Sequence, residues 1–126
     1  VVIRHDSHAS RRKEKLSTAR EVAVGQYCGP TELRENSTTY SVDLLTGQGT
    51  GWYFDRREHR SLLASLARNT PKVLDLFSYS GGFGVTCANY GAEDVLCVDS
   101  SESALELAQQ SAAANSVGNR LRTSRS

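Results

Sequence analysis

The feature that most constrains this chain is an apolar, strand-like run that leads directly into a glycine-rich turn. Residues 73–84 read Val-Leu-Asp-Leu-Phe-Ser-Tyr-Ser-Gly-Gly-Phe-Gly. The apolar part is nearly continuous, which is typical of a strand buried on both faces, because a half-buried strand alternates apolar and polar residues. The glycines favour a tight turn at the carboxyl end of the strand. Together these residues predict a strand–turn–helix unit of an α/β protein.

Four segments of alternating type follow one another in the second half of the chain. Gly91 suits the position after the first helix, and Ser100 or Ser101 is a suitable N-cap for the second. The expected segments are a strand over 72–77, a helix over 84–90, a strand over 94–99 and a helix over 102–115. This order predicts a parallel sheet covered on both faces.

The first half is more polar and is interpreted as a small α+β segment. Its expected elements are a short helix over 7–16, strands over 21–24 and 38–45, a glycine loop near 47–51, and a helix over 55–69 with Leu62, Leu63, Leu66 and Ala67 on one face. We therefore divide the chain into a partial small domain over 1–48, a loop and linking helix over 49–70, and the first part of the α/β domain over 71–126.

Composition excludes several classes of protein. The 126 residues carry a formal net charge of +1, which excludes a strongly basic histone-like protein and an acidic disordered one. No apolar run approaches the ~18 residues that a membrane span needs. Cys28, Cys87 and Cys97 are widely spaced and odd in number, so they predict neither a disulfide framework nor a zinc knuckle. We expect a cytoplasmic protein without a metal site, and we interpret His5 and His8 as surface residues.

The glycine turn and two carboxylates indicate the kind of cofactor. Asp99 ends the second strand at roughly the spacing, ~20 residues after the turn, at which a carboxylate receives the hydroxyls of a ribose. A dinucleotide fingerprint would read G-x-G-x-x-G, whereas Gly81, Gly82 and Gly84 read G-G-x-G. Asp75 precedes them and would repel a pyrophosphate but favour a cation. This pattern favours S-adenosylmethionine (SAM), which carries a sulfonium and an ammonium group.

Several motifs resemble those of class I SAM-dependent methyltransferases. They are residues 73–84, the Val-Asp-Ser-Ser at 98–101 and the Ala-Leu-Glu-Leu-Ala at 104–108. Within that class the chain is similar to the RlmI-like family, which methylates C5 of cytosine in large-subunit (23S-type) ribosomal RNA. The upstream run VDLLTGQGTGWYFDRREHR at 42–60 resembles that family's "vDl-GqkTGfflDqRenR" signature, although Gly49, Arg56 and His59 depart from it. Arg-His-Asp-Ser at 4–7 resembles the family's "R-N-D-S".

The resemblance implies a fold and a set of site residues. The fold is α/β, with a truncated Rossmann-like methyltransferase core preceded by a small α+β domain. Asp75, Ser78, Gly81 and Gly82 would surround the methionine end of SAM. Asp99, with Ser100 beside it, would hold the ribose. Four upstream residues would border the cofactor or help assemble the site: Thr50, Asp55, Arg57 and Arg60. The implied partner is ribosomal RNA, and a homodimer is possible for the full-length family.

The sequence assigns no catalytic residue. In the family a cysteine thiolate attacks cytosine C6, and that cysteine and an acidic motif lie on later strands. Cys87 and Cys97 fall within an apolar helix and strand and are interpreted as core residues, and Cys28 falls in a turn. Residues 120–126 lack the pattern of a third strand, so we expect a sheet of two strands followed by a disordered end, left by a truncation or a frameshift. We therefore expect marginal stability and no methyl transfer by this chain alone.

Two other functions stay open from the sequence. One is a fragment of an NAD-type oxidoreductase, which the glycine spacing disfavours. The other is a non-enzymatic RNA-binding module that uses the basic first half, including the run Arg-Arg-Lys-Glu-Lys at 11–15. Trp52, Tyr53 and Phe54 are expected to be partly core and partly surface, although such aromatic residues can also stack on bases.

Overall fold

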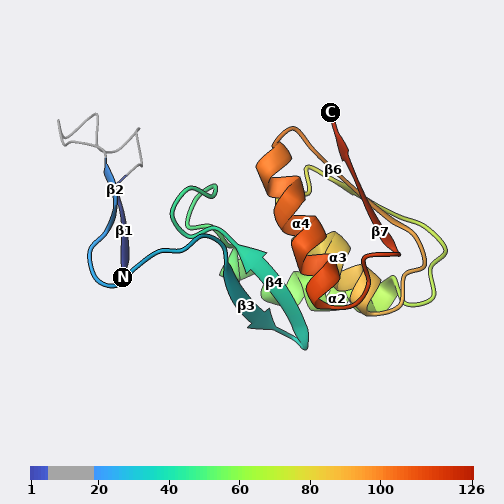
Figure 1. Cartoon of the computed structure of the whole chain (residues 1–126). Coiled ribbons are helices and arrows are strands. Elements are labelled where there is room, and N and C mark those ends of the chain that lie inside the picture. The colour runs from blue at the N-terminus through green and yellow to red at the C-terminus, as the bar shows by residue number, and fades with distance from the viewer. Residues whose placement is uncertain (6–18) are drawn as a thin grey trace.

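A computed structural model of the chain describes residues 1–5 and 19–126. The helix expected over 7–16, His8 and the basic run at 11–15 lie outside the described residues. The first two strands, β1 (Val2–His5) and β2 (Ala19–Val22), pair antiparallel, with Arg4 opposite Arg20. This two-stranded unit lies at one end of the molecule, and the parallel sheet lies at the other (Figure 1).

A second antiparallel pair, β3 (Thr31–Glu35) and β4 (Thr38–Val42), forms a hairpin. Its two turn residues, Asn36 and Ser37, both have positive φ angles, 48° and 61°. Two left-handed turn residues give the type I′ geometry, whose twist matches that of the strands on either side. The hairpin therefore has a fixed register, and it places alternate residues of β4 toward the core.

The second half forms a three-stranded parallel sheet in the order β5-β6-β7. Two helices, α3 and α4, connect the strands and lie between this sheet and the β3–β4 hairpin, as their contacts with both show (Figure 1). The elements are β5 (Val73–Leu76), α3 (Gly82–Asn89), β6 (Val95–Asp99), α4 (Glu102–Ala114) and β7 (Leu121–Arg125). The sequence predicted the first four of these within a few residues.

The third strand corrects the prediction of a two-stranded sheet with a disordered end. β7 pairs in parallel with β6, from Val95 opposite Leu121 to Asp99 opposite Arg125. Leu121 is buried, and Arg122 forms an ion pair of 2.9 Å with Asp94. The strand is polar because it is the edge of the sheet, and backbone pairing rather than apolar content defines it. A prediction from apolar pattern alone therefore missed it.

Two predicted apolar surfaces are exposed, contrary to the expectation of a sheet covered on both faces. The helix expected over 55–69 is a 3₁₀ turn, Phe54–Arg56, followed by α2 (Arg57–Leu66). The leucines of α2, Leu62, Leu63 and Leu66, are exposed. On and after β5, Leu74, Leu76 and Phe77 are exposed as well. The periodicity identified an apolar face correctly, but within the described residues this face lines an open groove.

A buried ion pair joins the hairpin to α2. Glu35 accepts hydrogen bonds from Nε and Nη2 of Arg60, at 2.7 and 2.9 Å, and both side chains are nearly inaccessible to solvent. The indole Nε1 of Trp52 also donates to Glu35, at 3.3 Å, and the Arg60 guanidinium lies 4.4 Å from the centre of the Trp52 ring. Burial raises the pKa of Glu35, but hydrogen bonds from Arg60 and Trp52 outweigh burial and hold that pKa below its ordinary value.

We predict that Glu35→Gln lowers the free energy of unfolding by about 3 kcal/mol, because it leaves the Arg60 charge buried without its partner. Urea denaturation followed by circular dichroism measures the change. The control is Glu32→Gln, an exposed acid on the same strand, which should change stability by less than about 0.5 kcal/mol. Because the folded pKa of Glu35 is lowered, its contribution should be lost as the pH falls below the ordinary range of a carboxyl group. Equal effects of the two substitutions would contradict the role of this pair.

Candidate site at the carboxyl ends of β5 and β6

A strained loop connects β5 to α3 at the carboxyl end of the sheet. Phe77 and Tyr79 both adopt left-handed backbone conformations, with φ angles of 56° and 49°, and Gly81 follows with 71°. Non-glycine residues rarely adopt this conformation, and clusters of such strain mark functional sites. In an open α/β sheet this is also the edge at which ligands bind.

Two carboxylates hold the middle of the loop and the first turn of α3. Asp75, on β5, accepts a hydrogen bond of 2.9 Å from the backbone N–H of Gly84. Asp99, at the end of β6, accepts one of 2.7 Å from the N–H of Tyr79 and another of 2.9 Å from the N–H of Ser101. The adjacent parallel strands thus bring the two predicted acids to the same loop.

Two of the predicted glycines have a clear steric role. A Cβ atom on Gly84 would lie 2.3 Å from Sγ of Cys97, so only glycine lets α3 pack this closely on β6. A Cβ atom on Gly81 would lie 2.7 Å from Cβ of Ala108, and its positive φ angle also favours glycine. These glycines therefore fix the distance between the loop and the helices α3 and α4.

A pocket of about 190 Å³, here called the serine pocket, lies against the loop. Its lining includes Asp75, Ser78, Ser80, Gly82, Trp52 and Arg60. The hydroxyl groups of Ser78 and Ser80 are buried and have no hydrogen-bond partner within the described part of the chain. Buried hydroxyls are normally hydrogen-bonded, so their arrangement fits a polar ligand in the serine pocket.

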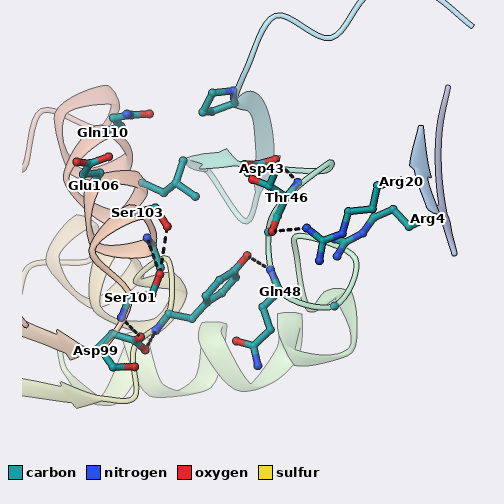
Figure 2. A pocket seen from close by; sticks show the side chains of 17 residues that line it. Arg4, Arg20, Asp43, Thr46, Gln48, Asp99, Ser101, Ser103, Glu106 and Gln110 are labelled. Atoms are coloured by element: carbon teal, nitrogen blue, oxygen red, sulfur yellow. Dashed lines mark hydrogen bonds between the residues drawn. The ribbon is translucent and has the colours of Figure 1, made fainter. Parts of the chain in front are cut away.

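A larger pocket, here called the Arg–Asp pocket, has a volume of about 600 Å³. Asp99 and Ser101 lie at one end of it, and Arg4 and Arg20 lie at the other (Figure 2). Ser100 also lines this pocket. Tyr79 lines both pockets, so they meet at this residue.

Tyr79 connects the predicted upstream glycine loop to the loop after β5. Its hydroxyl accepts a hydrogen bond of 2.9 Å from the backbone N–H of Gln48, while its own N–H donates to Asp99 (Figure 2). Its ring also makes an edge-on contact with Tyr53, with ring centres 6.1 Å apart. Burial raises the pKa of Tyr79, so the hydroxyl stays protonated at neutral pH. The side chain therefore fixes the position of both loops relative to Asp99.

The upstream residues predicted from the resemblance do not all reach these pockets. Arg60 lines the serine pocket, but its guanidinium is bound to Glu35 and to the carbonyl oxygen of Tyr53. Arg57 lies on the outer side of Glu35, at 3.4 Å. Asp55 is exposed and forms an ion pair with its neighbour Arg56, and the hydroxyl of Thr50 donates to the carbonyl of Trp52. Thr50, Asp55 and Arg57 line neither the serine nor the Arg–Asp pocket.

Burial and charge determine how the acids and thiols of the site ionise. Burial raises the pKa of Asp75, and the nearby charge of Asp99 raises it further. Burial also raises the pKa of Cys97 to about 12 and that of Cys87 to about 11, with the Asp75 charge adding to both. These two thiols are therefore protonated core residues and poor nucleophiles. Cys28 is exposed on the segment between β2 and β3 and lines neither pocket.

The described residues include no group of three or more His, Cys, Asp or Glu side chains placed to hold a metal ion. None of the helices found in residues 1–5 and 19–126 is long and apolar enough to cross a membrane.

Comparison with known proteins identifies the family. The family model described as S-adenosylmethionine-dependent methyltransferase matches residues 4–121. The chain belongs to this family. SAM is accordingly its cofactor, and solved structures similar to this chain include complexes with SAH and with AdoMet. The predicted resemblance and the truncated Rossmann-like fold are confirmed.

The curated relatives of this SAM-dependent methyltransferase are much longer than the chain. "Ribosomal RNA large subunit methyltransferase I" of Tolumonas auensis is 39% identical over 112 residues, which are 86% of this chain but 28% of the relative. The protein of the same name from Aeromonas salmonicida is 38% identical over the same shares. Among solved structures, a protein from Streptococcus mutans described as a SAM-dependent methyltransferase has a TM-score of 0.74 at 26% identity, covering 86% of this chain and 29% of its own.

The sequence did not single out three residues that line these pockets: Tyr79, Ser80 and Gln48. Ser80 lies within the predicted glycine turn, but the sequence does not show whether a serine hydroxyl is buried or exposed. Tyr79 and Gln48 are 31 positions apart, and their hydrogen bond depends on how two loops fold together. The alternation of Ser, Tyr and Ser before the glycines was the only available signal.

We predict that Tyr79→Phe weakens SAM binding about fivefold, because losing one hydrogen bond of about 1 kcal/mol lets the two loops move relative to Asp99. Isothermal titration calorimetry on the whole chain measures the effect. The matched control is Tyr90→Phe, which removes the hydroxyl that donates to the Asn36 carbonyl far from both pockets. Tyr90→Phe should leave SAM affinity unchanged, and an unchanged affinity in Tyr79→Phe would contradict the role of Tyr79.

Proposed function

We propose that this chain is the SAM-binding part of a methyltransferase that transfers a methyl group to C5 of a cytosine in large-subunit ribosomal RNA. The observation that carries the proposal is the pair of carboxylates, Asp75 and Asp99, which hold one strained glycine loop against two adjoining pockets. The names of the curated relatives support large-subunit ribosomal RNA as the substrate. Cytosine C5 as the methylated atom is proposed from the resemblance of the sequence motifs to the RlmI-like family.

The serine pocket fits the methionine end of SAM. Asp75 supplies a negative charge for the ammonium and sulfonium groups, and its buried position strengthens that attraction. Ser78 and Ser80 offer buried hydroxyls to the carboxylate or ammonium group of the donor. Gly82 lines the pocket, whereas Gly81 does not line it and instead lets the loop lie against Ala108 of α4. SAM supplies an activated methyl group on its sulfonium, and these residues bind and orient it.

The Asp99 end of the Arg–Asp pocket fits the ribose. A carboxylate can accept two hydrogen bonds from a diol, and Asp99 is half-buried and held by two backbone N–H groups. Ser100 is exposed beside it on the pocket wall. We assign Arg60 and Arg57 to assembly of the site through Glu35, because their guanidinium groups lie against that carboxylate. Thr50 and Asp55 are kept as candidates for contact with SAM or with RNA at the rim.

We propose no nucleophile within the chain, because Cys87 and Cys97 are buried and protonated. The chain should therefore bind the donor without transferring its methyl group. Since the chain spans about 28% of the length of its curated relatives, the activity of the whole protein is itself part of this proposal. A homodimer of the full-length protein stays a prediction.

We predict that Asp75→Asn stabilises the free chain and weakens SAM binding about fivefold. Because burial raises the folded pKa of Asp75, its ionised form costs stability at every pH above that pKa, and a neutral amide removes this cost. The Asn side-chain oxygen can still accept from Gly84. Thermal unfolding should show a melting temperature higher by a few degrees, and calorimetry should show the weaker binding.

The control is Asp94→Asn, which removes an acid at the opposite end of β6 that is paired with Arg122. It should leave SAM affinity unchanged and slightly lower the melting temperature. If Asp75→Asn lowered stability or left SAM affinity unchanged, the assignment of Asp75 would be wrong.

We predict no methyl transfer to 23S ribosomal RNA by the 126-residue chain in an assay with radiolabelled SAM. The full-length Aeromonas salmonicida relative, assayed with the same RNA, serves as the positive control. Turnover by the chain alone would contradict the absence of a nucleophile. Failure of SAM to bind in calorimetry would contradict the proposed function as a whole.

A further inference from the structure

Two arginines lie side by side on the β1–β2 unit. The register of the strands places Arg4 directly opposite Arg20, so both side chains leave the same face. Two guanidinium groups that leave one face of a strand pair side by side can both contact the same anion.

Both arginines point into the Arg–Asp pocket (Figure 2). Nη1 of Arg20 donates to the carbonyl oxygen of Thr46, at 3.3 Å, in the loop that also carries Gln48. The Arg4 charge acts on the hydroxyl of Tyr79: burial raises the pKa of Tyr79, and Arg4 is among the groups that oppose this shift. The two arginines thus lie at the end of the pocket opposite Asp99, with Tyr79 and Gln48 between.

Asp43 is the carboxylate that lines the pocket near the arginine end among the described residues, and its own neighbours bind it. Oδ1 of Asp43 accepts hydrogen bonds from Tyr27, at 2.6 Å, and from the N–H groups of Leu45 and Thr46, at 2.9 and 2.8 Å. The hydroxyl of Thr46 donates to Oδ2 of Asp43, and this bond together with the others outweighs the effect of burial and lowers the pKa of Asp43 to about 2. At the opposite end of the pocket Asp99 and Glu106 supply negative charge. The pocket is therefore acidic at one end and basic at the other.

We propose that Arg4 and Arg20 form a phosphate-binding surface that receives the sugar–phosphate backbone of the RNA substrate at the mouth of the Arg–Asp pocket. The inference rests on the proposed function, since it assigns the acidic end to the cationic donor and the basic end to the polyanionic acceptor. Guanidinium groups fit phosphate oxygens through paired hydrogen bonds, and SAM carries no phosphate that would compete for them. RNA is therefore the occupant that matches both the charge and the position of this surface.

The test measures binding of a fluorescein-labelled, 20-nucleotide single-stranded RNA to the whole chain by fluorescence anisotropy at several KCl concentrations. Arg4→Gln/Arg20→Gln should weaken binding and lower the slope of log affinity against log salt by about 1.4, since each contact to a single strand contributes about 0.7. Arg4→Lys/Arg20→Lys should keep most of the slope. SAM affinity, measured by calorimetry, should stay within about twofold in both variants, because it depends on the acidic end.

The matched control is Arg34→Gln/Arg68→Gln, which removes the same charge from two exposed arginines that do not line the Arg–Asp pocket. It should leave the slope nearly unchanged. Equal slopes in the two Gln variants, no RNA binding by the wild-type chain at low salt, or a parallel loss of SAM affinity would overturn the proposal. If the chain binds RNA through these arginines but does not bind SAM, the proposed function is wrong and the phosphate-binding surface is still supported.

Discussion

The loop between β5 and α3 depends on two carboxylates at the ends of adjacent parallel strands. Asp75 accepts from the N–H of Gly84 and Asp99 from the N–H of Tyr79, so the first turn of α3 and the middle of the loop are fixed although the loop backbone is strained. Keeping the Asp75 carboxylate ionised in this buried position costs free energy of folding, because burial raises its pKa. A protein that needed only a turn here would not require a buried acid. The strain and the buried charge are consistent with a site shaped for a cationic ligand.

The rest of the molecule serves to position this loop. The hairpin β3–β4 and α2 are joined through Glu35 and Arg60, and Trp52 packs between that ion pair and the loop at Gly82. Tyr79 adds a second connection, to the upstream loop at Gln48. Segments that precede the Rossmann-like part in sequence therefore contribute to the lining of both pockets beside this loop.

The sequence could predict whatever depends on local pattern. Apolar runs predicted β5 and β6, and the pattern of acids and glycines predicted the loop. Both carboxylates could be placed at one edge of the sheet because the carboxyl ends of parallel strands lie together. It could not predict β7, which is polar and forms through backbone pairing at an edge. It also did not reveal that Arg60 is bound to Glu35, since the two residues come from separate elements and meet only in the folded chain. The exposed face of Leu62, Leu63 and Leu66 was identified as apolar, but periodicity does not say what covers a face.

The most direct test is an amide-resolved NMR titration of the chain with SAM. The account predicts that the resonances of Tyr79, Gly81, Gly82, Gly84 and Ser100 shift together and saturate together, while those of β1 and β2 stay in place. The amides of Tyr79 and Gly84 are decisive, because they donate to the two carboxylates. Shifts that cluster away from this loop, or amides of Tyr79 and Gly84 that do not respond at saturating SAM, would contradict the central claim that the two carboxylates hold the donor site.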